Sequence, residues 1–198
     1  MQEFVLASGS STRQAMLKAA NVSFQVEKPR IDEEMIRASM EAEGAPPRDI
    51  ADLLAELKAR KISEKRPGAL VLGSDQVLEF EGKAFGKPET AQDALEQLNR
   101  LRGKTHRLLS AAVLVKDGKP VWRHVGVVRL TMRDFSDTYR DAYLERNWPG
   151  LSESVGGYKL EEEGVRLFSK VEGDYFNVLG LPLLELLGFL SLRGDIDG

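Results

Sequence analysis

Residues 69–77 have the sequence "ALVLGSDQV", and the interpretation of this stretch decides the fold. A continuous apolar run such as residues 69–72 is typical of a strand that is buried on both faces. We expect this strand to end at Gly73, Ser74 and Asp75, because small and acidic residues favour turns. A carboxylate at the carboxyl end of a strand lies where open α/β sheets bind ligands, so Asp75 is a candidate general base or metal ligand. A structural role, in which Asp75 only forms a turn, explains the same sequence equally well.

The rest of the chain alternates between strand-like and helix-like segments, which predicts an α/β fold with at least one antiparallel hairpin. The other expected strands are residues 3–8, residues 22–28, a hairpin over residues 105–132 that turns at residues 117–119, and short strands with turns over residues 156–175. The expected helices are residues 10–20, 49–65, 90–101, 136–147 and 181–192. Residues 31–49 are rich in charge and end in "GAPPRD", a loop signature. The expected helix N-caps are Ser10 or Ser11, Asp49, Thr90 and Ser136.

The composition limits the size of the protein and the partners that it can have. Its 198 residues suit one domain, or one domain with two lobes around a cleft. A net charge of −3 gives no general attraction to nucleic acid or anionic lipid, so we expect neither polymeric nucleic acid nor a membrane as a partner. The absence of cysteine excludes disulfides, thiolate metal ligands and a cysteine nucleophile. Because the first residues lack the pattern of a signal peptide and no apolar stretch could span a membrane, a cytoplasmic protein is expected.

A phosphate-binding turn is one interpretation of "LASGSSTR" at residues 6–13. A strand there leads through small hydroxyl residues into a helix, whose free N–H groups and positive end would face an anion. Arg13 adds a guanidinium that matches phosphate oxygens. An ordinary helix cap followed by a surface arginine is the more common explanation of such a motif by itself. Since neither G-x-G-x-x-G nor a Walker sequence is present, a Rossmann dehydrogenase and a P-loop enzyme lose their best support.

Other charged residues carry weaker signals. "PRIDEE" at residues 29–34 ends in carboxylates of the kind that bind a hard divalent cation, although a solvated acidic loop is more common. Lys87 lies in "GKP" at residues 86–88, where a glycine and a proline fix its backbone and could direct its ammonium toward a phosphate. An ordinary loop lysine is also compatible with that position. Lys58 lies on an expected helix, where lysines are usually solvated, and so indicates nothing by itself.

These motifs occur together and in one order, and the chain resembles the Maf family of nucleoside triphosphate pyrophosphatases over most of its length. The segments that carry the resemblance are "LASGSSTRQAML", "PRIDEE", "LAELKA", "LGSDQV", "GKP", "GKTH", "GGYKLEEEG" and "EGDYFNVLGLPLLEL". The resemblance implies an α/β fold with a mixed sheet and two lobes around a central nucleotide-binding cleft, similar to that of inosine triphosphatase. This single domain would span residues 1–192, and a charged C-terminal tail would follow at residues 193–198.

The resemblance also implies a reaction, the hydrolysis of nucleoside triphosphates, including modified or noncanonical ones, to the monophosphate and diphosphate. A divalent cation, Mg²⁺ or Mn²⁺, is the implied cofactor, and a link to cell-division arrest and a cytoplasmic location are implied as well. A nucleotide sensor that acts on a division protein without catalysis is the alternative, and a homodimer stays open. The implied roles are catalytic for Asp75, phosphate-binding for Ser8, Arg13, Lys58 and Lys87, and metal-binding for Glu33 and Asp75.

Base specificity in the resemblance depends on the residues around the catalytic acid. The branch of the family that acts on 7-methyl-GTP carries Ser-Asp-Gln where this chain has Ser74, Asp75 and Gln76, whereas the branch that acts on dTTP and UTP carries Ala-Asp-Thr. The chain is therefore closer to the 7-methyl-GTP branch, and a dTTP/UTP pyrophosphatase is the alternative. Thr12 departs from that branch, which has an aromatic residue there, preceded by proline. Glu161, after "GGYKL", is a further specificity position, and its carboxylate could accept hydrogen bonds from guanine.

Overall fold

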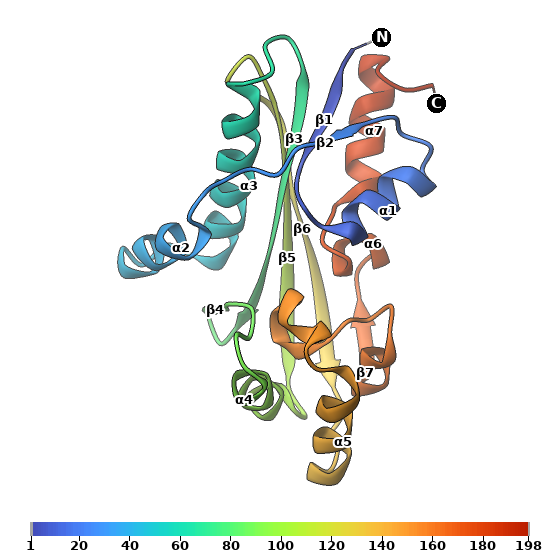
Figure 1. The fold of residues 1–198 in the computed structure, drawn as a ribbon. Helices are drawn as coiled ribbons and strands as arrows, with labels where there is room; N and C mark the ends of the chain where they lie inside the picture. The colour runs from blue at the N-terminus through green and yellow to red at the C-terminus, as the bar shows by residue number, and fades with distance from the viewer. Residues whose placement is uncertain (1, 198) are drawn as a thin grey trace.

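A mixed seven-stranded sheet forms the centre of the computed structural model, which describes residues 2–197 (Figure 1). The strand order is β2-β1-β3-β5-β6-β7, and β4 pairs with β3 beside this path. β1 pairs in parallel with β2 and β3, and the other pairs are antiparallel, so the α/β class with a mixed sheet is confirmed. The strands are β1 (Phe4–Ala7), β2 (Gln25–Val26), β3 (Leu70–Phe80), β4 (Lys83–Phe85), β5 (Thr105–Lys116), β6 (Lys119–Met132) and β7 (Phe168–Glu172).

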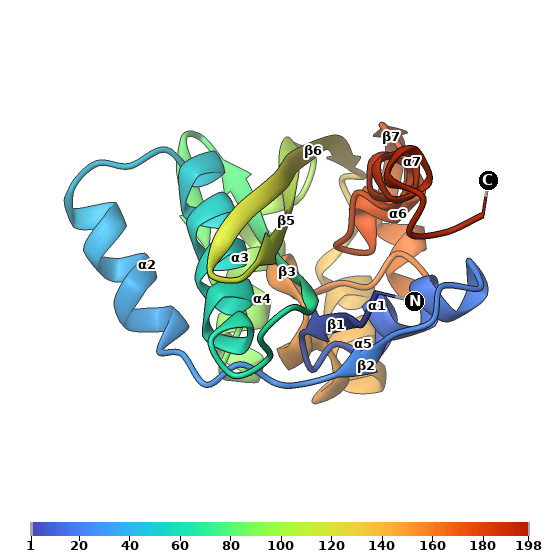
Figure 2. The ribbon, with the colours of Figure 1, turned by 90° about the horizontal axis from the view of Figure 1, so that it is seen from above.

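Helices cover both faces of the sheet at the end where the chain termini lie, and two further helices, α4 (Ala91–Leu101) and α5 (Asp137–Asn147), lie at the opposite end (Figure 1). The other α-helices are α1 (Ser11–Ala19), α2 (Glu33–Ala42), α3 (Pro47–Ser63), α6 (Tyr175–Val178) and α7 (Leu183–Arg193). The short 3₁₀ helices are η1 (Gly150–Glu153), η2 (Val155–Gly157) and η3 (Glu163–Leu167). Figure 2 shows α3 on one side of the sheet and α1 with α7 on the other.

Separate apolar cores lie at the two ends of the sheet. Leu54 of α3 packs with one face of β1, β3 and β5, and Leu17 of α1 packs with Leu186 of α7 on the opposite face. Leu98 of α4 and Tyr143 of α5 belong to a third core around the far ends of β3, β5 and β6. The sheet therefore connects two lobes, as expected.

The edge of β3 that faces β1 is open over residues 74–77. β1 pairs with β3 only as far as Gly73, and β4 pairs with it only from Leu78 onward. Both strands use the same edge, because β5 occupies the other edge along residues 70–79. The chain thus leaves an unpaired gap in the sheet where its neighbours change, and such changes are where α/β sheets bind ligands.

The prediction that β3 ends at Asp75 is wrong, because the strand continues to Phe80. Pairing with β5 supplies the backbone hydrogen bonds that keep the later residues extended. Gly73 forms no turn, and its small size instead lets α3 approach the strand: an added Cβ would lie 2.0 Å from the Ala55 carbonyl oxygen. Asp75 therefore lies in the middle of a strand, at its unpaired stretch.

The sequence indicated no helix in the charge-rich residues 31–49, but this segment contains α2 and the start of α3. Of the expected loop "GAPPRD", residues 44–46 lie outside the helices and Pro47 begins α3. Asp32 caps α2 by accepting a hydrogen bond from the Met35 N–H at 3.0 Å. No α2 residue is fully buried, but Ile36 and Met40 lie one turn apart on the helix and pack against the core that α3 shares with the sheet. Asp49 lies in the first turn of α3 instead of at its N-cap, which is Pro46.

Most other local predictions are confirmed. Ser10, Thr90 and Ser136 are the N-caps of α1, α4 and α5, and each side chain accepts a hydrogen bond from a first-turn N–H. β5 and β6 form the expected hairpin. Residues 156–167 differ from the prediction, since they fold into 3₁₀ turns before β7 begins. Over residues 2–197, no helix has the length and apolar character that crossing a bilayer requires.

Candidate active site

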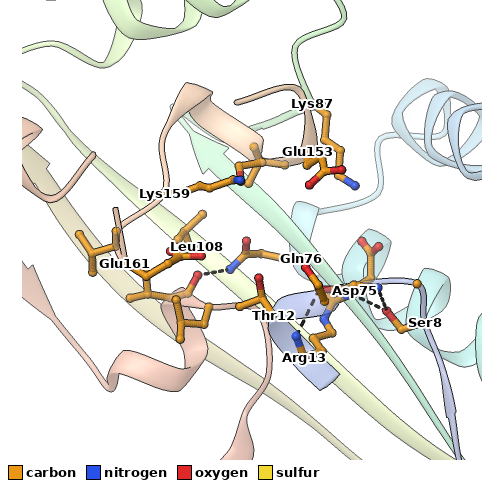
Figure 3. A pocket seen from close by; sticks show the side chains of 18 of the residues that line it. Ser8, Thr12, Arg13, Asp75, Gln76, Lys87, Leu108, Glu153, Lys159 and Glu161 are labelled. Carbon is orange, nitrogen blue, oxygen red and sulfur yellow. Dashed lines mark hydrogen bonds between the residues drawn. The ribbon is translucent and has the colours of Figure 1, made fainter. Parts of the chain in front are cut away.

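A cleft of about 430 Å³ opens beside the unpaired edge of β3 (Figure 3). Its walls come from the turn before α1, from β3, from the loop between β4 and α4, and from the 3₁₀ segments. The cleft brings together every residue that the sequence proposed for the site: Ser8, Thr12, Arg13, Glu33, Lys58, Asp75, Gln76, Lys87 and Glu161.

A buried ion pair joins α3 to the middle of β3. Lys58 Nζ donates to Asp75 Oδ1 at 2.8 Å and to Glu33 Oε2 at 2.9 Å. Lys58 is 6% exposed and Asp75 is 5% exposed, so this lysine is not a solvated helix residue. Asp75 Oδ2 is buried and accepts no hydrogen bond from the described residues. A desolvated carboxylate oxygen without a partner is costly, and it is available to a proton, a water or a cation.

Glu33 and Asp75 fit the ligand preference of Mg²⁺ or Mn²⁺, which bind carboxylate oxygens. Glu33 is half-buried, and the unpartnered Oδ2 of Asp75 supplies a second oxygen. Among residues 2–197, no group of three or more acidic or histidine side chains is close enough to hold a metal by itself. A cation in this cleft would therefore complete its coordination with water or with substrate phosphates, as Mg²⁺ commonly does.

Arg13 is held against the C-terminal segment instead of extending into solvent. Its Nε donates to the Gly180 carbonyl oxygen at 2.8 Å, and its Nη1 donates to Ser8 Oγ at 3.3 Å. Burial lowers the pKa of Arg13, and the charges of Asp75 and Glu33 oppose that shift. A guanidinium remains charged under these conditions, so Arg13 supplies a fixed positive charge to the cleft.

The turn before α1 forms as the sequence predicts, and it acts as a helix cap. Ser10 Oγ accepts from the Arg13 N–H at 3.3 Å, and the Ser10 N–H donates to Ser8 Oγ at 3.2 Å. The capping interpretation is thus correct, and it is compatible with the phosphate-binding interpretation because the same turn holds Ser8 and Arg13 at the cleft.

Lys87 reaches the cleft from the loop between β4 and α4 and remains exposed to solvent. Desolvation at the cleft lowers the pKa of its ammonium, Glu33 raises it, and the positive charges of Arg13 and Lys58 lower it further. Three cations therefore repel one another near Asp75. A bound polyanion would relieve this repulsion, which makes the cleft suited to several linked phosphates.

Gln76 lines the cleft together with the apolar residues Leu108 and Val178. Its side-chain nitrogen Nε2 lies 3.0 Å from Ser110 Oγ and 2.9 Å from the Val178 carbonyl oxygen. The same nitrogen lies 3.0 Å from the carbonyl oxygen of Asn177. The amide of Gln76 is therefore anchored to β5 and α6.

Tyr158 lines the same part of the cleft and is fixed from behind by His106. Its hydroxyl lies 2.7 Å from His106 Nε2, and both residues are buried. Burial lowers the pKa of His106 to about 4, so the imidazole is neutral at physiological pH.

Sequence reasoning missed several residues of the cleft. Tyr158 and Lys159 belong to the segment "GGYKLEEEG", but only Glu161 was selected from it. Glu153 comes from η1 and faces the cleft in Figure 3, and no sequence pattern indicated it. Lys28, from the loop after β2, is a further basic residue of the wall. Lys159 is a charged residue inside a segment that carries the family resemblance, whereas Glu153 lies outside all of those segments.

An acid, an arginine and two lysines that meet at a gap in a mixed sheet define an α/β protein whose cleft is suited to a polyanion. The chain belongs to the Maf family, since the family described as "Maf-like protein" matches residues 3–192. It is 60% identical over 193 residues to a protein of Ruegeria pomeroyi named nucleoside triphosphate pyrophosphatase, with 98% of this chain and 97% of the relative covered.

Two further comparisons concern more distant proteins. A relative from Mesorhizobium japonicum named 7-methyl-GTP pyrophosphatase is 46% identical over 197 residues, with 100% of this chain and 99% of the relative covered. A solved structure from Mycobacterium abscessus, titled nucleoside-triphosphatase and dITP/XTP pyrophosphatase, has a TM-score of 0.46 and 15% identity. That alignment covers 98% of this chain and 95% of the other.

Proposed function

We propose that this chain is a nucleoside triphosphate pyrophosphatase, a hydrolase that converts a nucleoside triphosphate and water into the monophosphate and diphosphate. The observation that carries the proposal is the buried Asp75, whose Oδ2 lacks a partner among the described residues, in a cleft that also holds Arg13, Lys58 and Lys87. Membership of the Maf family and the names of the relatives support the same reaction.

The positive side chains would bind and orient the phosphate chain. A triphosphate carries about four negative charges, which favour charge-assisted hydrogen bonds from arginine and lysine. Arg13 is already held by Gly180 and Ser8, so little side-chain freedom is lost when a phosphate binds. Lys87 is more exposed and would close onto the phosphates from the opposite wall.

Asp75 would take the proton of the attacking water. Lys58 occupies Oδ1 and so fixes the carboxylate, which leaves Oδ2 as the basic atom. The water oxygen forms a bond to the α-phosphorus, and the anhydride bond between the α- and β-phosphates breaks. The diphosphate leaves, and the proton of the water passes to Asp75. With a Mg²⁺ or Mn²⁺ held by Glu33 and Asp75, Oδ2 would serve as its ligand instead of as the base, and the cation would neutralise phosphate charge and lower the pKa of a bound water.

For the base, we propose 7-methyl-GTP or another modified nucleotide, and dTTP or UTP is the alternative. Gln76 and Glu161 line the cleft, and the 46% identical relative from Mesorhizobium japonicum is named for 7-methyl-GTP. Thr12 also lines it, and a threonine offers no aromatic ring to stack on a cationic base. We therefore expect the 7-methyl group to add little affinity.

A nucleotide panel with Mg²⁺ or Mn²⁺ and diphosphate as the readout tests this function. We expect release of diphosphate from at least one of 7-methyl-GTP, GTP, dTTP and UTP. Binding of these nucleotides without turnover would favour the sensor alternative, in which the protein regulates division through a partner. A role in division arrest, a cytoplasmic location, a single domain over residues 1–192 and a homodimer stay predictions.

A further inference from the structure

The hydrogen bonds around Gln76 fix the orientation of its side-chain amide. The carbonyl oxygens of Asn177 and Val178 can only accept hydrogen bonds, and both lie within 3.0 Å of one amide atom of Gln76. If that atom were Oε1, two oxygens would face a third without a proton between them. The atom must therefore be the Nε2 amino group, and the opposite atom, Oε1, is the carbonyl oxygen.

Ser110 confirms this polarity independently. Its hydroxyl proton is committed to the Asn177 carbonyl oxygen, because Ser110 Oγ lies 2.6 Å from that atom. Oγ can then only accept from Gln76, whose Nε2 lies 3.0 Å away. Ser110 is fully buried, so no water replaces this bond. Ser110 thus holds the amino group of Gln76 in place.

The carbonyl oxygen of Gln76 is left facing the cleft. None of the described residues donates a hydrogen bond to Oε1, and Gln76 is a lining residue that is only partly buried. Figure 3 shows the Gln76 side chain between Asp75 and the wall that carries Leu108 and Glu161. The anchored amide cannot rotate to offer a donor instead, so this wall presents a hydrogen-bond acceptor.

We propose that Gln76 Oε1 accepts the ring N–H of the nucleobase, and that the cleft thereby selects bases with a ring N–H over bases with a ring nitrogen acceptor. Guanine carries N1–H, and uracil and thymine carry N3–H, whereas the matching ring nitrogens of adenine and cytosine are acceptors. Ser110 is a positioning residue for this selection. The proposal rests on the proposed function and narrows its substrate class.

The position of Gln76 favours the base over the phosphates as its ligand. Arg13, Lys58 and Lys87 gather around Asp75, and a carbonyl oxygen would repel a phosphate. Around Gln76 the wall contains the apolar side chains of Leu108 and Val178, which suit the flat faces of a base.

Methylated nucleotides test the proposal directly. We expect kcat/KM to fall at least about tenfold from GTP to N1-methyl-GTP, and similarly from UTP to N3-methyl-UTP, because each methyl group removes the N–H that Oε1 accepts. The 2′-deoxy and 3′-deoxy forms of the same nucleotides should be affected less. A larger loss with the deoxy forms would assign Oε1 to the sugar and overturn the proposal.

Variants separate hydrogen bonding from steric exclusion. Gln76→Met keeps the length of the side chain but removes the acceptor, so the ratio of kcat/KM between GTP and N1-methyl-GTP should fall toward one. Ser110→Ala should lower the same ratio partway, because the amide loses one of its anchors. Ser63→Ala is the matched control: Ser63 is also buried but accepts from the Gly118 N–H outside the cleft, so the ratio should stay that of the unchanged protein. A ratio that persists in Gln76→Met would mean steric exclusion and would overturn the proposal.

The affinities of the same nucleotides, measured by calorimetry without divalent cation, test the acceptor role of Gln76 separately from hydrolysis. If the protein hydrolyses nucleotides but does not distinguish N1-methyl-GTP from GTP or N3-methyl-UTP from UTP, the proposed function stands and the acceptor role of Gln76 fails. If it hydrolyses none but still binds the unmethylated forms at least about tenfold more tightly, Gln76 keeps its role and the proposed function fails. Equal binding of both forms, or no binding of any, overturns the acceptor role.

Discussion

Two polar clusters in this protein reach the same cleft, one through Asp75 and one through Tyr158, but they differ in charge. Lys58, Asp75 and Glu33 form a charged cluster between α3 and β3. His106 and Tyr158 form a neutral pair between β5 and the 3₁₀ segment. Each leaves one buried atom without a partner among the described residues, Oδ2 of Asp75 and Nδ1 of His106.

The charge decides what each unpartnered atom implies. Burying an unpaired neutral nitrogen costs less than burying an unpaired oxygen of a carboxylate, so the His106 pair is acceptable as a purely structural support for Tyr158. The Asp75 oxygen is harder to explain by structure, because an apolar pair would fill the same space without that penalty. Under the proposed function, the charged cluster is therefore where we expect the chemistry, and the neutral pair supports the wall that we propose for the base.

The largest effect should come from Asp75→Asn. Loss of the base or cation ligand is expected to reduce kcat by at least about 100-fold, while circular dichroism and the melting temperature indicate an intact fold. Asp141→Asn is a suitable control, because that aspartate is mostly exposed and pairs with Arg140. Near-normal turnover by Asp75→Asn would remove the distinction between the two clusters.

The neutral pair should affect stability in acid instead of catalysis. The folded-state pKa of His106 is about 4, below the ordinary value of 6.5, so the unfolded chain binds a proton first as the pH falls. This contribution to stability is complete above pH 6.5 and is lost on descending toward pH 4. His106→Gln keeps a partner for Tyr158 but does not titrate.

Denaturant unfolding at several pH values measures this difference. Between pH 6.5 and pH 4, the unfolding free energy of the unchanged protein should fall by about 3 kcal/mol more than that of His106→Gln. If the unfolding free energies of the two proteins fell in parallel with pH, His106 would take up a proton in the folded state as readily as in the unfolded chain, and the pair would not stay neutral.

A smaller effect is expected from Lys87→Ala, which removes one positive charge from the phosphate end of the cleft. Because Lys87 is exposed, its loss should leave the melting temperature nearly unchanged. The value of kcat/KM should fall about tenfold, as expected for one hydrogen bond to a charged group. Lys83→Ala, an exposed lysine of the neighbouring β4, is the control and should change neither quantity. Equal effects of the two variants would argue against a phosphate contact.

The sequence located the candidate residues better than it described the backbone around them. Ser10, Thr90 and Ser136 were predictable as caps, because capping depends on residues within one turn. The continuation of β3 past Asp75 was not, because it depends on pairing with β5 far along the chain. The gap in the sheet that forms the cleft follows from this pairing and is invisible in the local sequence.

Lys58 shows the same limit for a side chain. On the sequence it resembles any lysine of an amphipathic helix, and its importance comes only from the packing of α3 against β3. Only the resemblance of the whole chain to a family indicated Lys58, because the residues next to it in the sequence contain no sign of the distant Asp75. Glu153, in a 3₁₀ turn, was missed by both approaches.

Identification of the products tests the central claim most directly. A nucleoside triphosphate from the panel, incubated with the protein and Mg²⁺ or Mn²⁺, would be followed by ³¹P NMR and ion-exchange chromatography. Cleavage at the α–β anhydride bond predicts nucleoside monophosphate and diphosphate in equal amounts, with no early nucleoside diphosphate or orthophosphate. Formation of nucleoside diphosphate and orthophosphate, or no product from any triphosphate, would contradict a pyrophosphatase cleft built around Asp75.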